Sequence, residues 1–141
     1  MRVSYESHHD DVARALTAWN ERESRLLVPS LFWAEVLNAL HRRHGWTAAR
    51  VAEGLMTLDG LEITTVEVDR PLLLLAASQM DAFGLTSYDA LYLALALTVD
   101  GRLATFEDRL AQAAGDRAVP LGPGGRSIAE PVADRPILTT G

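Results

Sequence analysis

The segment LTSYDALYLALAL, residues 85–97, decides the fold of this chain. Its apolar residues cover nearly every side of a helix, and a helix of that kind is buried all round. We predict this helix over residues 87–99, with Thr86 as its N-cap. Asp89 is the only formally charged side chain between Asp81 and Asp100, so it must find donors, a cation or a metal within apolar surroundings.

Strands and helices alternate outward from this segment. Short apolar or β-branched runs predict strands at residues 26–28, 61–68, 102–105 and 118–121. Helical spacing and end signals predict helices at residues 8–21, 31–44, 47–59, 70–83 and 106–114. Ser30, Thr47 and Asp69 are the expected N-caps of three of them. Such alternation is typical of an α/β domain with a mostly parallel sheet, in which ligands gather at the carboxyl ends of the strands.

Composition limits the possible chemistry. The 141 residues are 48% hydrophobic, enough for one domain with a core, which we place at residues 1–121. Residues 122–141 are rich in Gly and Pro, and we expect a tail or wrapping arm. The absence of Cys excludes disulfides and thiolate zinc sites, and the absence of Lys excludes Schiff bases and phosphate-loop lysines. The N-terminus does not resemble a signal peptide and no stretch is long enough to span a membrane, so we expect a soluble intracellular domain with net charge −6.

Acids stand in the early turns of three predicted helices: Asp89, Glu35, and the pair Glu107 and Asp108. Each has a local explanation as well. Asp89 would close a capping box with Thr86, Glu35 would lie on a solvated helix face, and Asp108 would sit at the third position of a helix capped by Thr105.

Taken together, the three positions predict a metal site. A parallel sheet would bring them to one edge, where clustered carboxylates repel one another unless a cation holds them. Hard oxygen ligands without Cys select Mg²⁺, with Mn²⁺ as a substitute, and such an ion can activate water while bridging a phosphate. Metal-assisted phosphodiester hydrolysis is therefore the chemical hypothesis.

A local basic patch lies at the end of the second predicted helix. It consists of His41, Arg42, Arg43, His44 and Arg50. We expect Arg42 and Arg43 to contact phosphates, although the helix dipole alone would also favour cations there. The neighbouring Trp46 is predicted to be exposed, where it could stack on a base.

The quoted segments resemble the PIN domain, and specifically the VapC-type ribonuclease toxins of toxin–antitoxin modules. Residues 85–96 resemble the family's Tyr-Asp-Ala signature. Residues 28–40, VPSLFWAEVLNAL, resemble the segment with the family's helical Glu, and residues 103–110, LATFEDRL, resemble its late strand end. The resemblance spans roughly residues 5–121. It implies a three-layer αβα fold, Mg²⁺-dependent endoribonuclease activity, cytoplasmic location, a homodimer and inhibition by a cognate antitoxin.

The resemblance also assigns residues. Asp89 would ligate the metal directly, and Glu35 would do so directly or through water. Glu107 would stand where the family has Asp, with Asp108 able to share that role. The family's first strand, which is central and ends in an Asp ligand, is missing here. We expect either a start site assigned too late or a truncated descendant. Residues 135–140 could pack into the gap, but the Pro and the brevity of this segment argue against a central strand.

Two other functions stay open. A PIN-like module that lacks one acid could bind an antitoxin or RNA without cutting it. A carboxylate-based phosphohydrolase acting on small molecules would require a nucleophilic Asp at the end of the missing first strand.

Overall fold

A parallel sheet forms the centre of the molecule. The computed structural model describes residues 26–120 and 137–139, so the helix predicted over residues 8–21 lies outside the described part. Within that part the sheet has five strands in the order β2-β1-β5-β3-β4, and every neighbouring pair is parallel. The strands are β1 (Leu26–Pro29), β2 (Thr64–Val66), β3 (Arg102–Thr105), β4 (Ala118–Pro120) and β5 (Ile137–Thr139). The predicted α/β class is confirmed.

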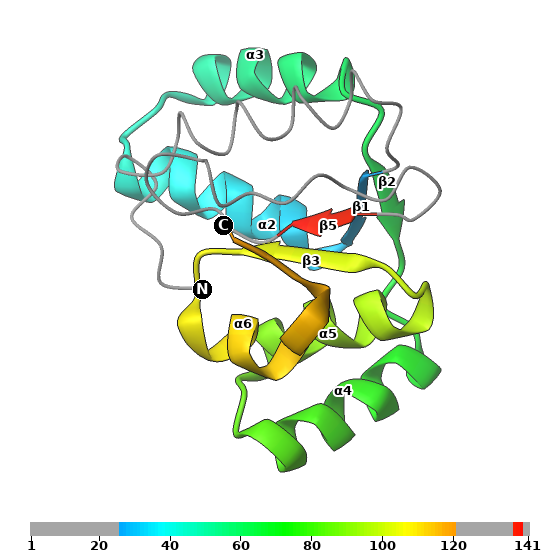
Figure 1. Ribbon diagram of the computed structural model, residues 1–141. Helices are drawn as coiled ribbons and strands as arrows, with labels where there is room; N and C mark the ends of the chain where they lie inside the picture. Colours follow the sequence, from blue (N-terminus) through cyan, green and yellow to red (C-terminus); the bar gives the residue numbers. More distant parts are fainter. Residues whose placement is uncertain (1–25, 121–136, 140–141) are drawn as a thin grey trace.

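Helices flank this sheet on both sides, and Figure 1 shows α3 and α4 on opposite sides of the strands. The α-helices are α2 (Leu31–Asn38), α3 (Ala48–Asp59), α4 (Arg70–Phe83), α5 (Ser87–Thr98) and α6 (Asp108–Ala114). A π-helix, η1 (Ala39–Arg43), continues α2, and a short 3₁₀-helix, η2 (Gly115–Arg117), precedes β4. None of the helices in the described part is long and apolar enough to cross a bilayer.

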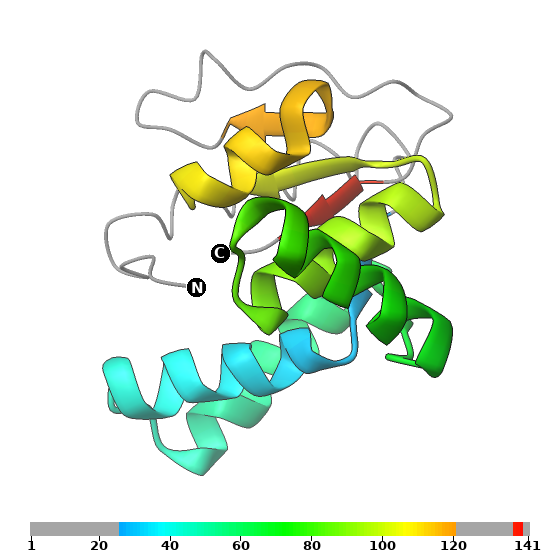
Figure 2. The same ribbon diagram turned by 90° about the horizontal axis from the view of Figure 1, so that it is seen from below.

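Helix α5 lies at the centre of the hydrophobic core. Residues 89–96 are all buried, as the sequence of this helix predicted. Figure 2 shows α4 in front of α5, and α5 also contacts β1, β5 and β3, so it lies between α4 and the sheet. Tyr92, Leu93 and Leu95 of α5 are fully buried, together with Val28 and Leu103 of the sheet. This packing fixes the position of the first turn of α5, which carries Asp89.

The central place in the sheet is taken by β5, and our expectation that the C-terminal segment would not supply a central strand is wrong. Leu138 pairs with Leu27 of β1 on one side and with Leu103 of β3 on the other. Brevity is no obstacle, because β1 and β3 are themselves only four residues long. Pro136 precedes the strand, so its missing N–H falls before the first ladder position rather than within it.

Several element ends differ from the sequence prediction. Three predicted caps are confirmed, since the side chains of Thr47, Asp69 and Thr86 each accept a hydrogen bond from a backbone N–H three residues on. Ser30 makes no such bond, because its backbone is already helical, whereas a capping residue typically has an extended backbone. The predicted strand 61–68 shortens to β2, since a turn occupies residues 60–62 and Glu62 has a positive φ of 54°.

Candidate active site

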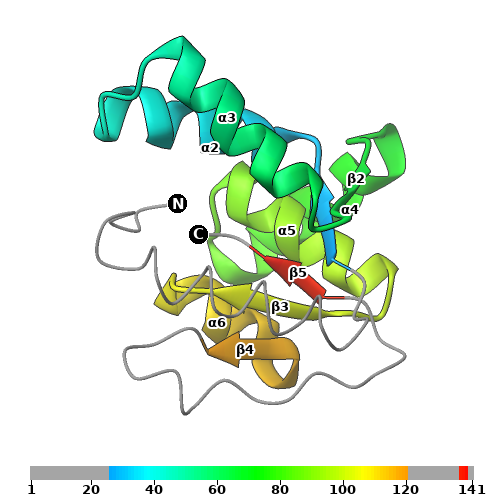
Figure 3. The ribbon, with the colours of Figure 1, turned by 90° about the horizontal axis from the view of Figure 1, so that it is seen from above.

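The carboxyl ends of the strands define one edge of the sheet. Helix α2 begins two residues after β1 ends, and α6 begins three residues after β3 ends. Helix α5 leads into β3 through residues 99–101, so its last turn lies at the start of β3. Its first turn therefore lies at the edge where β3 ends, since a 12-residue helix is about 18 Å long and a four-residue strand about 13 Å. Figure 1 shows α5 beneath β5 and β3, and Figure 3, seen from above, shows α5 beside β5.

Asp89 is buried in the first turn of α5, with only 9% of its surface exposed. Its backbone N–H donates to Thr86 Oγ1 at 3.2 Å, which is the cap expected from the sequence. The cap fixes the backbone of this turn and places a carboxylate among apolar neighbours. An ionised carboxylate in such a position is stabilised only by donors or a cation.

Glu35 of α2 does not lie on a solvated helix face. It is half-buried, and its Oε1 accepts a hydrogen bond of 2.7 Å from the Tyr92 hydroxyl of α5. Burial raises the pKa of the Glu35 carboxyl above its ordinary value, and the Asp89 carboxylate raises it further, while the Tyr92 bond opposes both effects. The two carboxylates therefore act on each other electrostatically, although they are far apart in the sequence.

Glu107 and Asp108 lie at the end of β3, where they begin α6. Glu107 is the N-cap residue and its N–H donates to Thr105 Oγ1 at 3.0 Å, so the predicted arrangement with Thr105 as N-cap and Asp108 at the third position is wrong. The chain bends at Phe106 before the helix starts. Glu107 is half-buried, whereas Asp108 is exposed.

The carboxylates of Glu35 and Asp89 are the candidate metal ligands at this edge. Across residues 26–120 and 137–139, no three His, Asp or Glu side chains come together closely enough to hold a metal ion. Glu107 and Asp108 therefore do not complete a group of three with Glu35 and Asp89. Mg²⁺ is commonly held by one or two carboxylates and keeps several waters, so the donor chemistry of the pair suits this ion.

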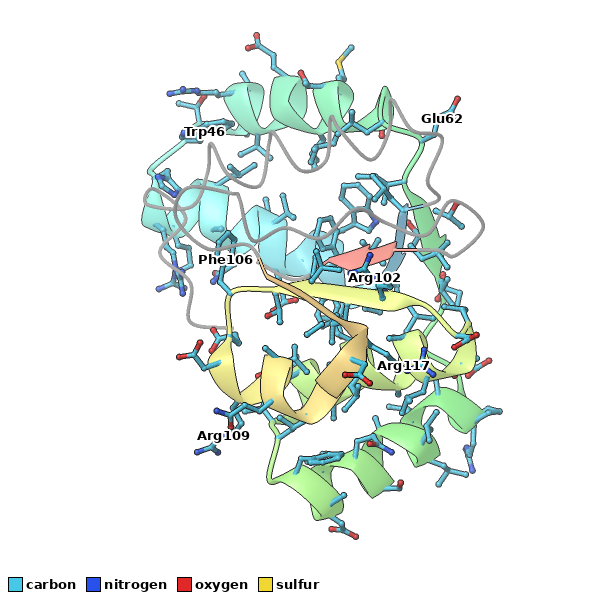
Figure 4. The ribbon with its side chains drawn as sticks, viewed as in Figure 1. Trp46, Glu62, Arg102, Phe106, Arg109 and Arg117 are labelled. Atoms are coloured by element: carbon cyan, nitrogen blue, oxygen red, sulfur yellow. The ribbon has the colours of Figure 1, made fainter. Side chains whose placement is uncertain are left out.

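Arg109 links the first turn of α6 to the turn before α5. Its Nη1 donates to the backbone oxygen of Gly84 at 3.3 Å. Gly84 ends α4 with a φ of +65°, a left-handed conformation that favours glycine. The bond connects the segment that carries Glu107 to the segment that positions Asp89. In Figure 4, Arg109 and Phe106 lie toward one end of β3 and Arg117 toward the other.

The basic patch lies at the same end of the molecule as Phe106, since Trp46 marks that end in Figure 4. His41, Arg42 and Arg43 are exposed on the π-helix η1. The expectation that Trp46 is exposed is wrong. Its ring is half-buried, because the guanidinium of Arg50 lies 4.1 Å from its centroid. This stacking keeps a cation at the surface above the ring.

Tyr92 is the site residue that sequence reasoning missed. It lies in the apolar run of α5 and is completely buried, so it was grouped with the core. One signal was present, because a buried Tyr hydroxyl usually needs a hydrogen-bond partner. Its spacing of three residues from Asp89 also puts both side chains on neighbouring positions of one helix face.

The fold and its acidic edge together define a nuclease-type α/β domain. The chain matches the PIN domain family over residues 3–116, and it belongs to that family. PIN domains are in general nucleases that use a divalent metal ion and bind nucleic acid. The matched region ends before β5, so the central strand lies outside it. No curated protein and no solved structure matches the chain.

Proposed function

We propose that this protein is a Mg²⁺-dependent endoribonuclease whose active site is the edge that carries Glu35 and Asp89. The observation that carries the proposal is that two acids from separate helices, Asp89 and Glu35, are buried and half-buried, and that the Tyr92 hydrogen bond links Glu35 to the helix of Asp89. A carboxylate that is withdrawn from water needs donors or a cation to stabilise it. When bound there, Mg²⁺ would polarise a phosphate oxygen and lower the pKa of a bound water. Mn²⁺ would serve as a substitute.

The residues of the chain have separate roles in this proposal. Asp89 and Glu35 hold the metal. Glu107 and Asp108 are outlying acids near the end of β3, whose loss would reduce activity less than loss of Asp89. Arg42 and Arg43 bind the RNA backbone, and their exposed position on η1 at the same end of the molecule supports this role.

The biological role is that of a toxin in a toxin–antitoxin pair. It rests on the resemblance of residues 85–96 to the signature of VapC-type toxins. A protein of this kind would cleave RNA in the cytoplasm, act as a homodimer and be inhibited by its cognate antitoxin.

The experiment that tests the proposal is RNA cleavage by the purified chain. Structured RNA is incubated with the protein and Mg²⁺ or Mn²⁺, with EDTA and Asp89→Asn as negative controls and Asp81→Asn as the matched control. Asp81 is an exposed acid of α4. We expect cleavage by the native chain and by Asp81→Asn, and none with EDTA or Asp89→Asn. Cleavage by Asp89→Asn at the native rate would refute the assignment of the site.

A second candidate is a PIN-like module that binds RNA or an antitoxin without cleaving it. One observation favours this candidate, because no group of three His, Asp or Glu side chains that could hold a metal ion occurs among the described residues. Absence of cleavage by a folded chain that still binds RNA would identify this function.

A further inference from the structure

Tyr92 connects the two helices that carry the paired acids. It is fully buried on α5, three residues after Asp89, and its hydroxyl donates to Glu35 Oε1 on α2 at 2.7 Å. This distance is the ordinary one for an O–H···O hydrogen bond. The ring of a Phe would fill the same space at this position, so the Tyr92 hydroxyl contributes through its hydrogen bond to Glu35.

The bond constrains the carboxylate of Glu35. A Glu side chain has three rotatable bonds, and a half-buried Glu without a fixed partner could occupy several rotamers. Holding Oε1 fixes the plane of the carboxylate and leaves the second oxygen for another partner. Helix α5 supplies the donor, so the same rigid element that carries Asp89 also orients Glu35.

We propose that Tyr92 is a positioning residue that holds the Glu35 carboxylate in place for metal binding together with Asp89. This inference rests on the proposed function, since it assigns Tyr92 to the same metal site. Residues that hydrogen-bond to metal ligands typically change metal affinity by about 10- to 100-fold when they are replaced. A Tyr that served only the stability of the core would change unfolding without a selective change in metal affinity.

The test is Mn²⁺ binding to the full chain, measured without RNA by the loss of the free-ion EPR signal. Tyr92→Phe removes the hydroxyl and keeps the ring. Tyr88→Phe is the matched control, because Tyr88 is on the same helix but is 57% exposed. We expect Tyr92→Phe to bind Mn²⁺ at least about tenfold more weakly than the native chain and Tyr88→Phe to bind it equally well.

A double-mutant cycle separates action through Glu35 from a general effect on the fold. Tyr92→Phe, Glu35→Ala and the double variant are compared in Mn²⁺ affinity, and their folding is checked by circular dichroism. If Tyr92 acts through Glu35, Tyr92→Phe has no further effect on Mn²⁺ affinity in the Glu35→Ala background, in which the hydrogen-bond acceptor is absent. Equal and independent effects in both backgrounds would overturn the inference.

The outcomes also separate this inference from the proposed function. Native-like Mn²⁺ affinity in folded Tyr92→Phe overturns the positioning role and leaves the metal site intact. Failure of the native chain itself to bind Mn²⁺ overturns both. If Tyr92→Phe does not fold, Glu35→Asp is compared with the native chain instead. The Asp side chain is one methylene shorter, so its carboxylate is withdrawn from the Tyr92 hydroxyl. Undiminished affinity in that variant contradicts the requirement for the bond.

Discussion

Leu138 lies level with Leu27 in the parallel register of the sheet, although the two residues come from opposite ends of the described chain. Their pairing joins β5 to β1, and β5 pairs on its other side with β3. Without β5, the sheet would divide into the pairs β2-β1 and β3-β4. The C-terminal strand is therefore a structural requirement for the edge that carries the acids.

Leu138→Pro is expected to destabilise the protein strongly. A central strand uses its backbone groups on both sides, and Pro removes a donor and leaves an acceptor on a neighbouring strand unsatisfied. One such loss costs about 1–3 kcal/mol, before any disruption of the neighbouring strands. Urea unfolding measures the change. Leu138→Val keeps the N–H and suits a strand, so it is the control, and equal stability of the two variants would show that β5 is dispensable.

The free energy of unfolding of the native protein is expected to fall as pH rises, and Glu35→Gln is expected to remove this fall. The folded pKa of Glu35 lies above the ordinary value of 4.5, so between these two pKa values the folded chain retains a proton that the unfolded chain has lost. The free energy of unfolding therefore falls as pH rises through this interval, and below pH 4.5 the contribution is fully present. Gln does not titrate and can still accept the Tyr92 bond.

The measurement is the free energy of unfolding of both proteins between pH 4 and pH 8. Glu35→Gln should be the more stable protein at neutral pH, by about 1.4 kcal/mol for each unit of raised pKa, and the advantage should shrink toward pH 4. Glu53→Gln, at an exposed position on α3, should show no such dependence. A constant difference across this range would contradict burial of the Glu35 charge.

Gly84→Ala is expected to cost about 1 kcal/mol of stability. Gly84 has a φ of +65°, and a Cβ there would meet nothing within 4 Å. The loss of stability therefore comes only from holding Ala in a left-handed backbone conformation. Gly60→Ala is the matched control, because Gly60 also ends a helix but has a φ of −68°. Chemical denaturation should place Gly60→Ala within about 0.5 kcal/mol of the native protein. A similar loss at both positions would contradict the left-handed conformation at Gly84.

Replacing Arg42 and Arg43 by Ala is expected to weaken RNA binding and its salt dependence. Each lost contact to a single-stranded phosphate should reduce the slope of log affinity against log salt by about 0.7. Binding is measured in the Asp89→Asn background, so that the RNA stays intact. Arg70→Ala, an exposed cation at the start of α4, is the control. An unchanged slope in the double variant would exclude the patch as a phosphate contact.

Local signals predicted most of the described elements. Residues 89–96 of α5 are all buried because this run is apolar on nearly every side, and the caps Thr47, Asp69 and Thr86 depend on contacts only three residues away. Features set by distant partners could not be predicted in this way. The central position of β5 depends on two strands that lie far away in the sequence, and three residues carry too weak a pattern to reveal it.

Residue type and helix position predict Glu35 and Asp89 as site residues, and this assignment stays a prediction. The hydrogen bond from Tyr92 to Glu35 could not be predicted in the same way, because it joins residues on two helices that only the tertiary packing brings together. The π-helix η1 likewise has no signal in the local sequence.

The position of β5 has a consequence for synthesis of the protein. Residues 137–139 leave the ribosome after all the other strands, and until then β2-β1 and β3-β4 lack the strand that joins them. Glu35 follows β1, whereas Asp89 stands on the helix that leads into β3, so the two acids belong to different halves of the unfinished sheet. The strand that joins these two halves is therefore synthesised after both acids.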